Sequence, residues 1–225
     1  MESANVVGYQ ANNVAAGWSI VTPCFENVDG EPYAIDKFTV NGVSDGDATV
    51  QSMNADGSWG TMGVWLNEFV DGDTVYPAGW FTDISGVTPA DITLKPGAAV
   101  MFSTTATGAS TQSAGQVPAT IAHDIITGWS MIGNASCATI SIDEITLEGV
   151  ADGDATVQVM NPDGSWGTMG VWLNEVVDGD TVYPAGWFTD ISGATAAEIT
   201  LTPGQSVMFS TTAIGAKAFI PSALK

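Results

Sequence analysis

A long internal duplication constrains this chain more than any other feature of its sequence. Residues 43–108 and 150–215 align at a constant offset of 107 and are identical at 55 of 66 positions. A repeat of this length is the size of a small domain, whereas the repeats of solenoid proteins are much shorter. We therefore predict two tandem homologous domains, residues 1–110 and 111–225, rather than an array of short repeats.

The segment between the two copies has a different composition. Residues 106–116 are small and polar, rich in Gly and Ser, and this is typical of a surface linker. Residues 5–42 and 115–149 are far less alike than the duplicated regions. The identity of the two copies does not by itself mark functional residues, because a duplication that recombination keeps uniform gives the same result.

The apolar residues occur in short runs separated by Gly, Pro, Asp and Asn, and no long stretch has helical periodicity. This pattern is typical of short β-strands. The strands predicted in the first copy are 5–9, 17–24, 35–40, 47–53, 59–66, 79–82, 91–94 and 98–104. Those predicted in the second copy are 119–122, 128–133, 142–147, 154–160, 166–173, 186–189, 198–201 and 205–211. We predict an all-β fold in which each copy is an antiparallel β-sandwich or open barrel.

Turn-forming residues join several of these strands. Residues 54–57 and 161–164 end in Asp-Gly, which suits a tight hairpin because glycine adopts positive φ without strain. Lys95–Gly97 and Thr202–Gly204 contain Pro-Gly and predict type II turns.

Two patterns predict which positions face the core. Ala48 and Val50 alternate with more polar residues, so we expect them to point inward, since side chains along a strand alternate between faces. Phe69 and Val87 are replaced only by other apolar residues in the second copy, which also favours core positions.

The chain is strongly acidic. It has 25 acidic residues, four lysines and no arginine, for a net charge of −21. Such a field repels nucleic acid and anionic membrane surfaces and attracts cations or basic partners. No apolar stretch approaches the ~20 residues that a spanning helix needs. The first residues lack the features of a signal peptide, and the Thr-, Ser-, Gly- and Asn-rich composition favours the mature form of a secreted or cell-surface protein over a cytoplasmic one.

The sequence offers little for catalysis. His123 is the single histidine, and no nucleophile-elbow, zinc-protease, phosphate-loop or CxxC motif is present. Pairs of carboxylates carry no information in so acidic a chain, so we predict no catalytic residues and no enzyme activity. Cys24 and Cys137 follow similar apolar segments; they either bridge the two copies or are buried as two separate thiols.

Two Asp-Gly-Asp sequences recur in both copies, at 45–47 and 71–73 and again at 152–154 and 178–180. Oxygen ligands on glycine-containing loops suit Ca²⁺, although the EF-hand spacing is absent. The alternative is that these aspartates only form turns. The residues that we predict as candidate calcium ligands are Glu68, Asp71 and Asp73 in the first copy and Glu175, Asp178 and Asp180 in the second.

Repeated tryptophans are the other candidate binding residues. Trp59 and Trp65 have the same strand parity, so on an unbroken strand both point to one face. Exposed, such a face stacks against sugar rings while Asn67 hydrogen-bonds their hydroxyls; buried, it is core. The candidate ligand-binding residues are Trp59, Trp65, Trp80, Trp166, Trp172 and Trp187.

The arrangement of motifs resembles a known kind of module. Each copy opens with a Gly-Trp-Ser strand (17–21 and 128–132) and continues with an Ile-Asp strand (35–40 and 142–147). Each then closes with a Pro-Gly hairpin whose last strand ends in Phe. This resembles secreted bacterial all-β repeat modules of extracellular and surface proteins, in which a "GW" opening strand is paired with a closing "PG-x-x-h-h-F" hairpin. The resemblance implies secretion and a structural or adhesive role, and it transfers no site residues.

Two functions follow from these observations. The first is a non-enzymatic, self-assembling surface protein, because two near-identical modules in series present the same surface twice and so favour homo-oligomers or polymers. The alternative is an extracellular carbohydrate-binding protein that uses the repeated tryptophans. Neither involves nucleic acid or insertion into a membrane.

Overall fold

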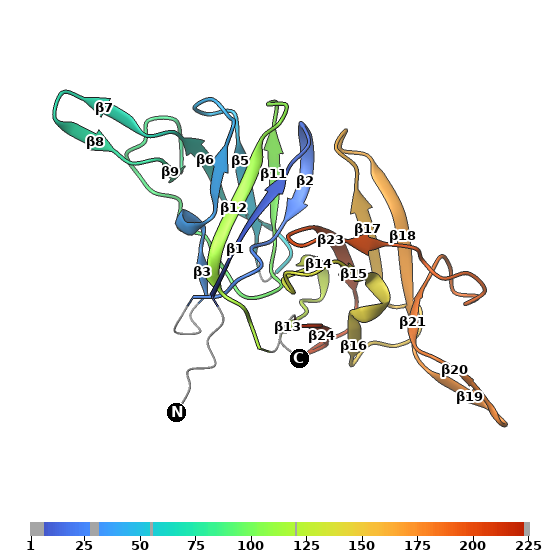
Figure 1. Cartoon of the computed structure of the whole chain (residues 1–225). Coiled ribbons are helices and arrows are strands. Elements are labelled where there is room, and N and C mark those ends of the chain that lie inside the picture. Colours follow the sequence, from blue (N-terminus) through green and yellow to red (C-terminus); the bar gives the residue numbers. More distant parts are fainter. Residues whose placement is uncertain (1–6, 28–31, 55, 120, 223–225) are drawn as a thin grey trace, which may run out of the picture.

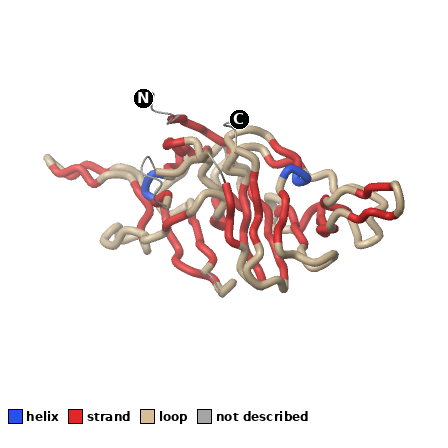
Figure 2. The backbone as a smooth tube through the Cα atoms, turned by 90° about the horizontal axis from the view of Figure 1, so that it is seen from below, coloured by secondary structure: helices blue, strands red, loops and turns tan. Residues whose placement is uncertain are grey.

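The computed structural model describes residues 7–27, 32–54, 56–119 and 121–222. Within them the fold is all-β, and the only helices are two single turns of 3-10 helix, η1 (Ile35–Lys37) and η2 (Ile142–Glu144). Figure 2 shows these two turns in a backbone that is otherwise strand and loop. The part of the chain that the structure describes contains no helix long and apolar enough to cross a membrane.

The described residues of the N-terminal half form twelve strands. They are β1 (Val7–Asn13), β2 (Gly17–Val21), β3 (Tyr33–Ala34), β4 (Thr39–Asn41), β5 (Thr49–Met53), β6 (Trp59–Leu66), β7 (Phe69–Asp71), β8 (Thr74–Tyr76), β9 (Gly79–Phe81), β10 (Thr93–Leu94), β11 (Val100–Thr104) and β12 (Ser110–Gln116).

The C-terminal half repeats this order. Its strands are β13 (Ile121–Asp124), β14 (Gly128–Gly133), β15 (Ile140–Ser141), β16 (Thr146–Glu148), β17 (Thr156–Met160), β18 (Trp166–Leu173), β19 (Val176–Asp178), β20 (Thr181–Tyr183), β21 (Gly186–Phe188), β22 (Thr200–Leu201), β23 (Ser206–Thr211) and β24 (Lys217–Ile220).

Each half contains the same set of antiparallel sheets. A five-stranded sheet has the order β2-β11-β5-β6-β9 in the N-terminal half and β14-β23-β17-β18-β21 in the C-terminal half. Three-stranded sheets have the orders β1-β12-β4 and β13-β24-β16. Small two-stranded sheets complete each half: β10-β3 and β7-β8, then β15-β22 and β19-β20.

The hydrophobic core of each half lies between its five-stranded and three-stranded sheets. In the N-terminal half, Val50 and Phe102 from the five-stranded sheet pack in one cluster with Val40 of β4. The C-terminal cluster is built in the same way and centres on Trp172 and Trp187, whose rings meet edge to face at 5.4 Å. Such edge-to-face pairs add to the stabilisation that burial of the rings provides.

A third cluster lies between the two halves. Ile20 and Met101 project from the opposite face of the first five-stranded sheet and pack against Met131 and Met208 of the second. Reciprocal backbone hydrogen bonds flank this layer, from Thr22 N to the Gly204 carbonyl at 2.9 Å and from Gly133 N to the Gly97 carbonyl at 2.8 Å. The two halves therefore pack sheet against sheet (Figure 1).

Several sequence predictions are confirmed here. Most predicted strands are present; those at 59–66, 128–133 and 166–173 match their predicted bounds, and the others are shorter, longer or shifted. Gly57 has φ of 79°, and its N–H bonds the Asn54 carbonyl at 2.9 Å, closing the predicted hairpin. The Ala98 N–H bonds the Lys95 carbonyl across the predicted Pro-Gly turn at 2.9 Å. Residues 5 and 6 of the first predicted strand lie outside the described residues.

The linker prediction is wrong. Residues 110–116 form β12, which pairs with β1 along its whole length and also with β4, so the predicted boundary at 110/111 falls inside a strand. Small polar residues fit here because Thr111 and Ser113 alternate inward and are buried. The sequence patterns also predicted no strand where β3, β7 and β8 lie, nor at their counterparts β15, β19 and β20 or at β24. They predicted strand at 35–37 and 142–144, where η1 and η2 lie.

The predictions for core positions are mixed. Ala48 and Val50 are fully buried, as predicted. Phe69 and Val87 are instead 60% and 79% exposed, so the prediction that they belong to the core is wrong. Phe69 lies on the projecting β7-β8 hairpin and Val87 in a loop, and neither packs into a core cluster.

The buried indoles carry much of the stability of each half. We expect Trp187→Ala to lower the free energy of unfolding by about 3–5 kcal/mol, because it leaves a cavity and removes the bond from its indole N–H to the Ile145 carbonyl. The matched control, Trp166→Ala, removes a half-exposed indole and should cost about 1 kcal/mol or less. Urea unfolding followed by circular dichroism measures both; equal losses would contradict this assignment of the core.

Candidate functional site

The first Asp-Gly-Asp sequence is a structural clamp. The Asp47 carboxylate accepts hydrogen bonds from the Thr104 hydroxyl at 2.6 Å, from the Thr105 N–H and hydroxyl, and from the Ala106 N–H. These bonds hold the end of β11 against the loop before β5. They also lower the pKa of Asp47, with the Thr104 and Thr105 hydroxyls as the largest causes. Asp154 makes the equivalent contacts with Thr211 and Thr212.

Asp45 completes this clamp. Its carboxylate accepts from the Asn67 N–H at 2.8 Å and from the Asn67 side-chain amide at 2.8 Å. The same Asn67 side chain accepts the indole N–H of Trp65 at 3.1 Å and donates to the Val43 carbonyl. Asn67 was predicted to bind sugar hydroxyls, yet its amide is engaged within the fold.

The second Asp-Gly-Asp sequence forms the tip of a projecting hairpin. Within the described residues, strands β7 and β8 pair only with each other, with Asp71 opposite Thr74, so Gly72 and Asp73 make a two-residue turn. Gly72 has φ of 59° at the first turn position, where type II′ hairpins require glycine. The C-terminal hairpin, with Gly179 at φ of 60°, repeats this geometry.

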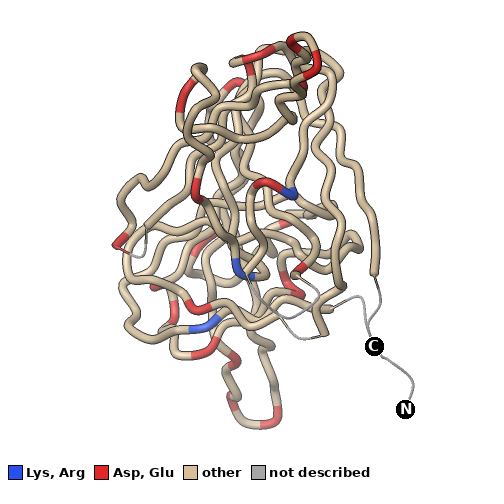
Figure 3. Tube along the Cα trace, turned by 90° about the vertical axis from the view of Figure 1, so that its left-hand side faces the viewer, with Lys and Arg blue, Asp and Glu red and all other residues tan. Residues whose placement is uncertain are grey.

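The structure does not bring the predicted calcium ligands together. Among the described residues, no group of three or more His, Cys, Asp or Glu side chains is close enough to hold a metal ion. The predicted ligands are Glu68, Asp71 and Asp73, with Glu175, Asp178 and Asp180 in the second half. They lie on and beside the exposed hairpins, in a molecule whose acidic residues are spread over many loops (Figure 3). The geometry therefore gives calcium binding no support.

These hairpins are unusually apolar for exposed segments. Val70 pairs with Val75, and Phe69 stacks on Tyr76 with ring centroids 6.1 Å apart, yet all four side chains are more than half exposed. The C-terminal hairpin has the same pairs, with Val176 in place of Phe69. Figures 1 and 2 show the two hairpins projecting from opposite ends of the molecule. Exposed apolar surface of this kind is a feature of interaction sites.

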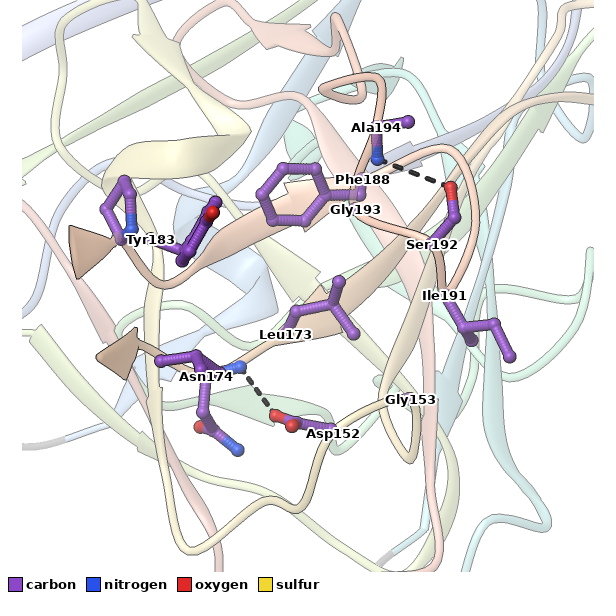
Figure 4. Close-up of a pocket in the computed structure, with 12 residues that line it drawn as sticks. Asp152, Gly153, Leu173, Asn174, Tyr183, Phe188, Ile191, Ser192, Gly193 and Ala194 are labelled. Carbon is purple, nitrogen blue, oxygen red and sulfur yellow. Dashed lines mark hydrogen bonds between the residues drawn. The ribbon is translucent and has the colours of Figure 1, made fainter. Parts of the chain in front are cut away.

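A hollow lies at the base of each hairpin. In the C-terminal half its volume is about 870 Å³, and Leu173, Tyr183, Phe188 and Ile191 line it (Figure 4). The N-terminal hollow has the equivalent residues and a volume of about 740 Å³. Both hollows are mainly apolar and are bordered by the clamp aspartates, Asp45 and Asp152.

The six candidate tryptophans divide into two groups. Trp65, Trp80, Trp172 and Trp187 are buried in the cores, so they are not available to a ligand. Trp59 is 49% exposed, whereas Trp65 is 3% exposed, so the two do not share a face as they would on an unbroken strand. The register shifts between Gln51 and Met53, which pair with Met62 and Trp59, so β6 carries an extra residue that reverses its alternation.

The exposed tryptophans gather between the two halves. Trp59 and Trp166 line a hollow of about 300 Å³ together with Trp129 and Gln158. Trp129 was not among the predicted residues. The sequence did contain a signal for Trp129, because a Gly-Trp-Ser segment opens a strand in both halves. A shift of one residue in the register of such a strand moves its tryptophan from the core face to the exposed face. Gly57 lies against the Trp129 backbone, where an added Cβ would be 3.2 Å from the carbonyl oxygen.

His123 lines another hollow between the halves, with Lys95, Asp124 and Ser130. Burial of its ring is the main cause that lowers its pKa. Within the described part of the chain, no hydrogen bond joins its side chain to a serine, threonine or cysteine. The prediction that the protein is not an enzyme stays a prediction.

Comparison with known proteins adds no family. No protein-family model, no curated protein and no solved structure matches this chain.

The Asp47 clamp makes stability depend on pH. Because the folded pKa lies below the ordinary value, the stabilisation is fully present above about pH 4 and is lost as the pH falls through and below that range. We expect Asp47→Asn to lower the free energy of unfolding by about 1 kcal/mol at pH 7. The difference from the parent protein should shrink between about pH 4 and pH 2.

The control for this measurement is Asp71→Asn. Asp71 lies at the exposed hairpin tip, and its side chain makes no hydrogen bond among the described residues. Unfolding curves at a series of pH values compare the two variants. A difference for Asp47→Asn that stays constant with pH would refute the clamp.

Proposed function

We propose that this protein is a non-enzymatic, exported structural protein that assembles with copies of itself. Each half is a β-sandwich domain of one duplicated module, with the domain boundary after β12 and not within it. The observation that carries the proposal is the pair of apolar hairpins at opposite ends of the molecule. A subunit with the same self-complementary element at both ends extends into a linear polymer.

The hairpins have the properties that edge pairing requires. In the described structure each is a two-stranded sheet on its own, so its outer edges present unpaired backbone groups. A lone two-stranded hairpin is only marginally stable in water, and pairing with a second hairpin would give a four-stranded sheet. A second copy also buries Val70 and Val75, which otherwise stay exposed to solvent.

Charge limits this assembly. Each hairpin tip carries two aspartates, within a chain of net charge −21, so two tips repel each other at low ionic strength. Salt screens this repulsion and strengthens apolar contacts, so assembly should increase with ionic strength. The location outside the cell is part of the proposal; the resemblance to secreted repeat modules and the composition support it.

Light scattering across a concentration series tests the assembly. At about 0.5 M sodium chloride, where the Debye length is ~4 Å, we expect the mass to grow with concentration beyond the 23.2 kDa monomer. Changing the cross-strand valine pair of each hairpin to threonine keeps the β-propensity and should leave a monomer. The four substitutions are Val70→Thr, Val75→Thr, Val177→Thr and Val182→Thr.

The matched control changes one end only. A chain with Val70→Thr and Val75→Thr keeps the C-terminal hairpin, so growth should stop at the dimer. A parent protein that stays monomeric under every condition would overturn the proposal, and so would a four-threonine variant that polymerises like the parent.

A second candidate function is the binding of an extracellular glycan. It is favoured by one observation, the three exposed indoles that line the hollow between the halves with Gln158. Aromatic faces stack on the apolar faces of sugar rings, and an amide can hydrogen-bond hydroxyl groups. The four buried tryptophans take no part in this proposal.

We expect a fluorescently labelled protein to bind a subset of a glycan array, and the double variant Trp59→Ala and Trp166→Ala to lose that binding. Trp18→Ala is the control, because Trp18 is also exposed but lines a different hollow. Binding that survives in the double variant, or that is lost equally in the control, would exclude this site.

A further inference from the structure

The two cysteines of the chain lie side by side although 113 residues separate them. Cys24 follows β2 in the N-terminal half, and Cys137 follows β14 in the C-terminal half. The Cys137 thiol donates a hydrogen bond to the Cys24 carbonyl oxygen at 2.9 Å, and Cys137 packs against the core cluster that contains Cys24. The loops that follow two equivalent strands thus meet between the halves, and each sulfur atom lies against the backbone of the other loop.

A tightly bonded turn holds Cys137 in this position. The fully buried Asn134 side chain donates to the Ala138 carbonyl at 2.6 Å and to the Leu201 carbonyl at 2.9 Å, and its oxygen accepts the Ser136 N–H at 3.0 Å. Cys137 has φ of 59°, the only positive value for a non-glycine residue in the described structure. A residue that is not glycine is strained there, so the surrounding bonds hold Cys137 in place.

The loop that carries Cys24 is fixed just as firmly. The Thr22 N–H bonds the Gly204 carbonyl of the other half, and the Cys24 sulfur lies 3.7 Å from the Asn134 carbonyl oxygen. An added Cβ at Gly133 would be 2.3 Å from the Thr22 side chain, so only glycine permits this approach of the two loops. Cys24 and Cys137 are therefore positioned by both halves together.

The two thiols differ in accessibility. Cys24 is fully buried, whereas Cys137 is partly exposed. Interaction with the Cys24 side chain lowers the pKa of Cys137, and the same interaction together with burial raises the pKa of Cys24. An external reagent therefore reaches Cys137 first, and this is also the sulfur that more readily becomes the reactive thiolate.

We propose that Cys24 and Cys137 form a disulfide that links the two halves, by exchange with a small-molecule or protein disulfide. The Cys137 thiolate attacks the external disulfide, forms a mixed disulfide and releases the first external thiol. The Cys24 sulfur then attacks the Cys137 sulfur, and the second external thiol leaves. Both cysteine protons end on the two released thiols, so the pair is oxidised by two electrons and the external disulfide is reduced by two.

Such a link closes a long loop of chain across the interface between the halves. Cross-links that close long loops restrict the unfolded chain most strongly, so the oxidised protein should melt higher. An interface built on a few methionines would then be supported by a covalent bond. This inference is independent of the proposed assembly, since it concerns the joining of two halves within one molecule.

The test uses the full chain, purified in a dithiol reductant and then incubated with oxidised glutathione. We expect the intact mass to fall by two hydrogens, and no thiol to react with an alkylating agent after denaturation. Cleavage after Lys37 separates the two cysteines, so the fragments should stay joined until they are reduced. The melting temperature should rise by roughly 10 °C on oxidation and return on reduction.

Two variants define the order of the steps. Cys24→Ser should keep one glutathione on Cys137, because no second thiol displaces it, whereas Cys137→Ser should leave Cys24 unmodified in the folded protein. A parent chain that carries two glutathiones, that keeps both thiols alkylatable, or that forms disulfide-linked dimers would overturn the proposal. The mass and fragment measurements on the parent chain decide this even if a variant fails to fold.

Discussion

The packing of the two five-stranded sheets against each other determines where every other feature of the molecule lies. Ile20, Met101, Met131 and Met208 form the layer between them. Methionine is flexible and polarisable, so it fills the space between two twisted sheets without the exact fit that branched side chains need. The two halves are near copies, and the reciprocal bonds at Thr22 and Gly133 show that they meet with matching surfaces. The contact uses one face of each sheet, while the other face of each covers its own core.

This arrangement brings the equivalent tryptophans of the two halves together and keeps their equivalent hairpins apart. Strands β6 and β18 bring Trp59 and Trp166 toward the contact, where they line one hollow. The hairpins that follow these strands leave the sheets and project in opposite directions (Figure 1). A duplicated sequence has thus produced one shared site at the centre and two separate sites at the ends. The central hollow has the size of a small-ligand site, whereas the end hairpins offer backbone edges and apolar side chains to a second protein.

Local chemistry made much of the fold predictable. Glycine at the turn positions and short apolar runs gave most strands and the hairpins, because these signals act within a few residues. The face of the exposed tryptophans was not predictable from alternation, because one extra residue in β6 reverses it and only the pairing with β5 reveals the shift. The exposure of Phe69 was missed for a similar reason. An apolar residue predicts burial only if its strand joins a packed sheet, and β7 pairs with β8 alone. Contact between Cys24 and Cys137 depends on how the halves meet, which no local pattern encodes.

The two kinds of Asp-Gly-Asp sequence show how the same three residues serve different ends. Asp47 and Asp154 accept hydroxyl and backbone donors, so they hold the ends of β11 and β23 in place and stabilise the fold. The side chains of Asp71 and Asp178 make no hydrogen bond among the described residues. These aspartates lie at the tips of hairpins that contribute no strand to the five-stranded sheets. A hairpin that supports no core and still exposes a valine pair is not explained by the stability of the monomer. Exposure of its apolar surface to water is unfavourable in an isolated subunit, and contact with another molecule removes that surface from water.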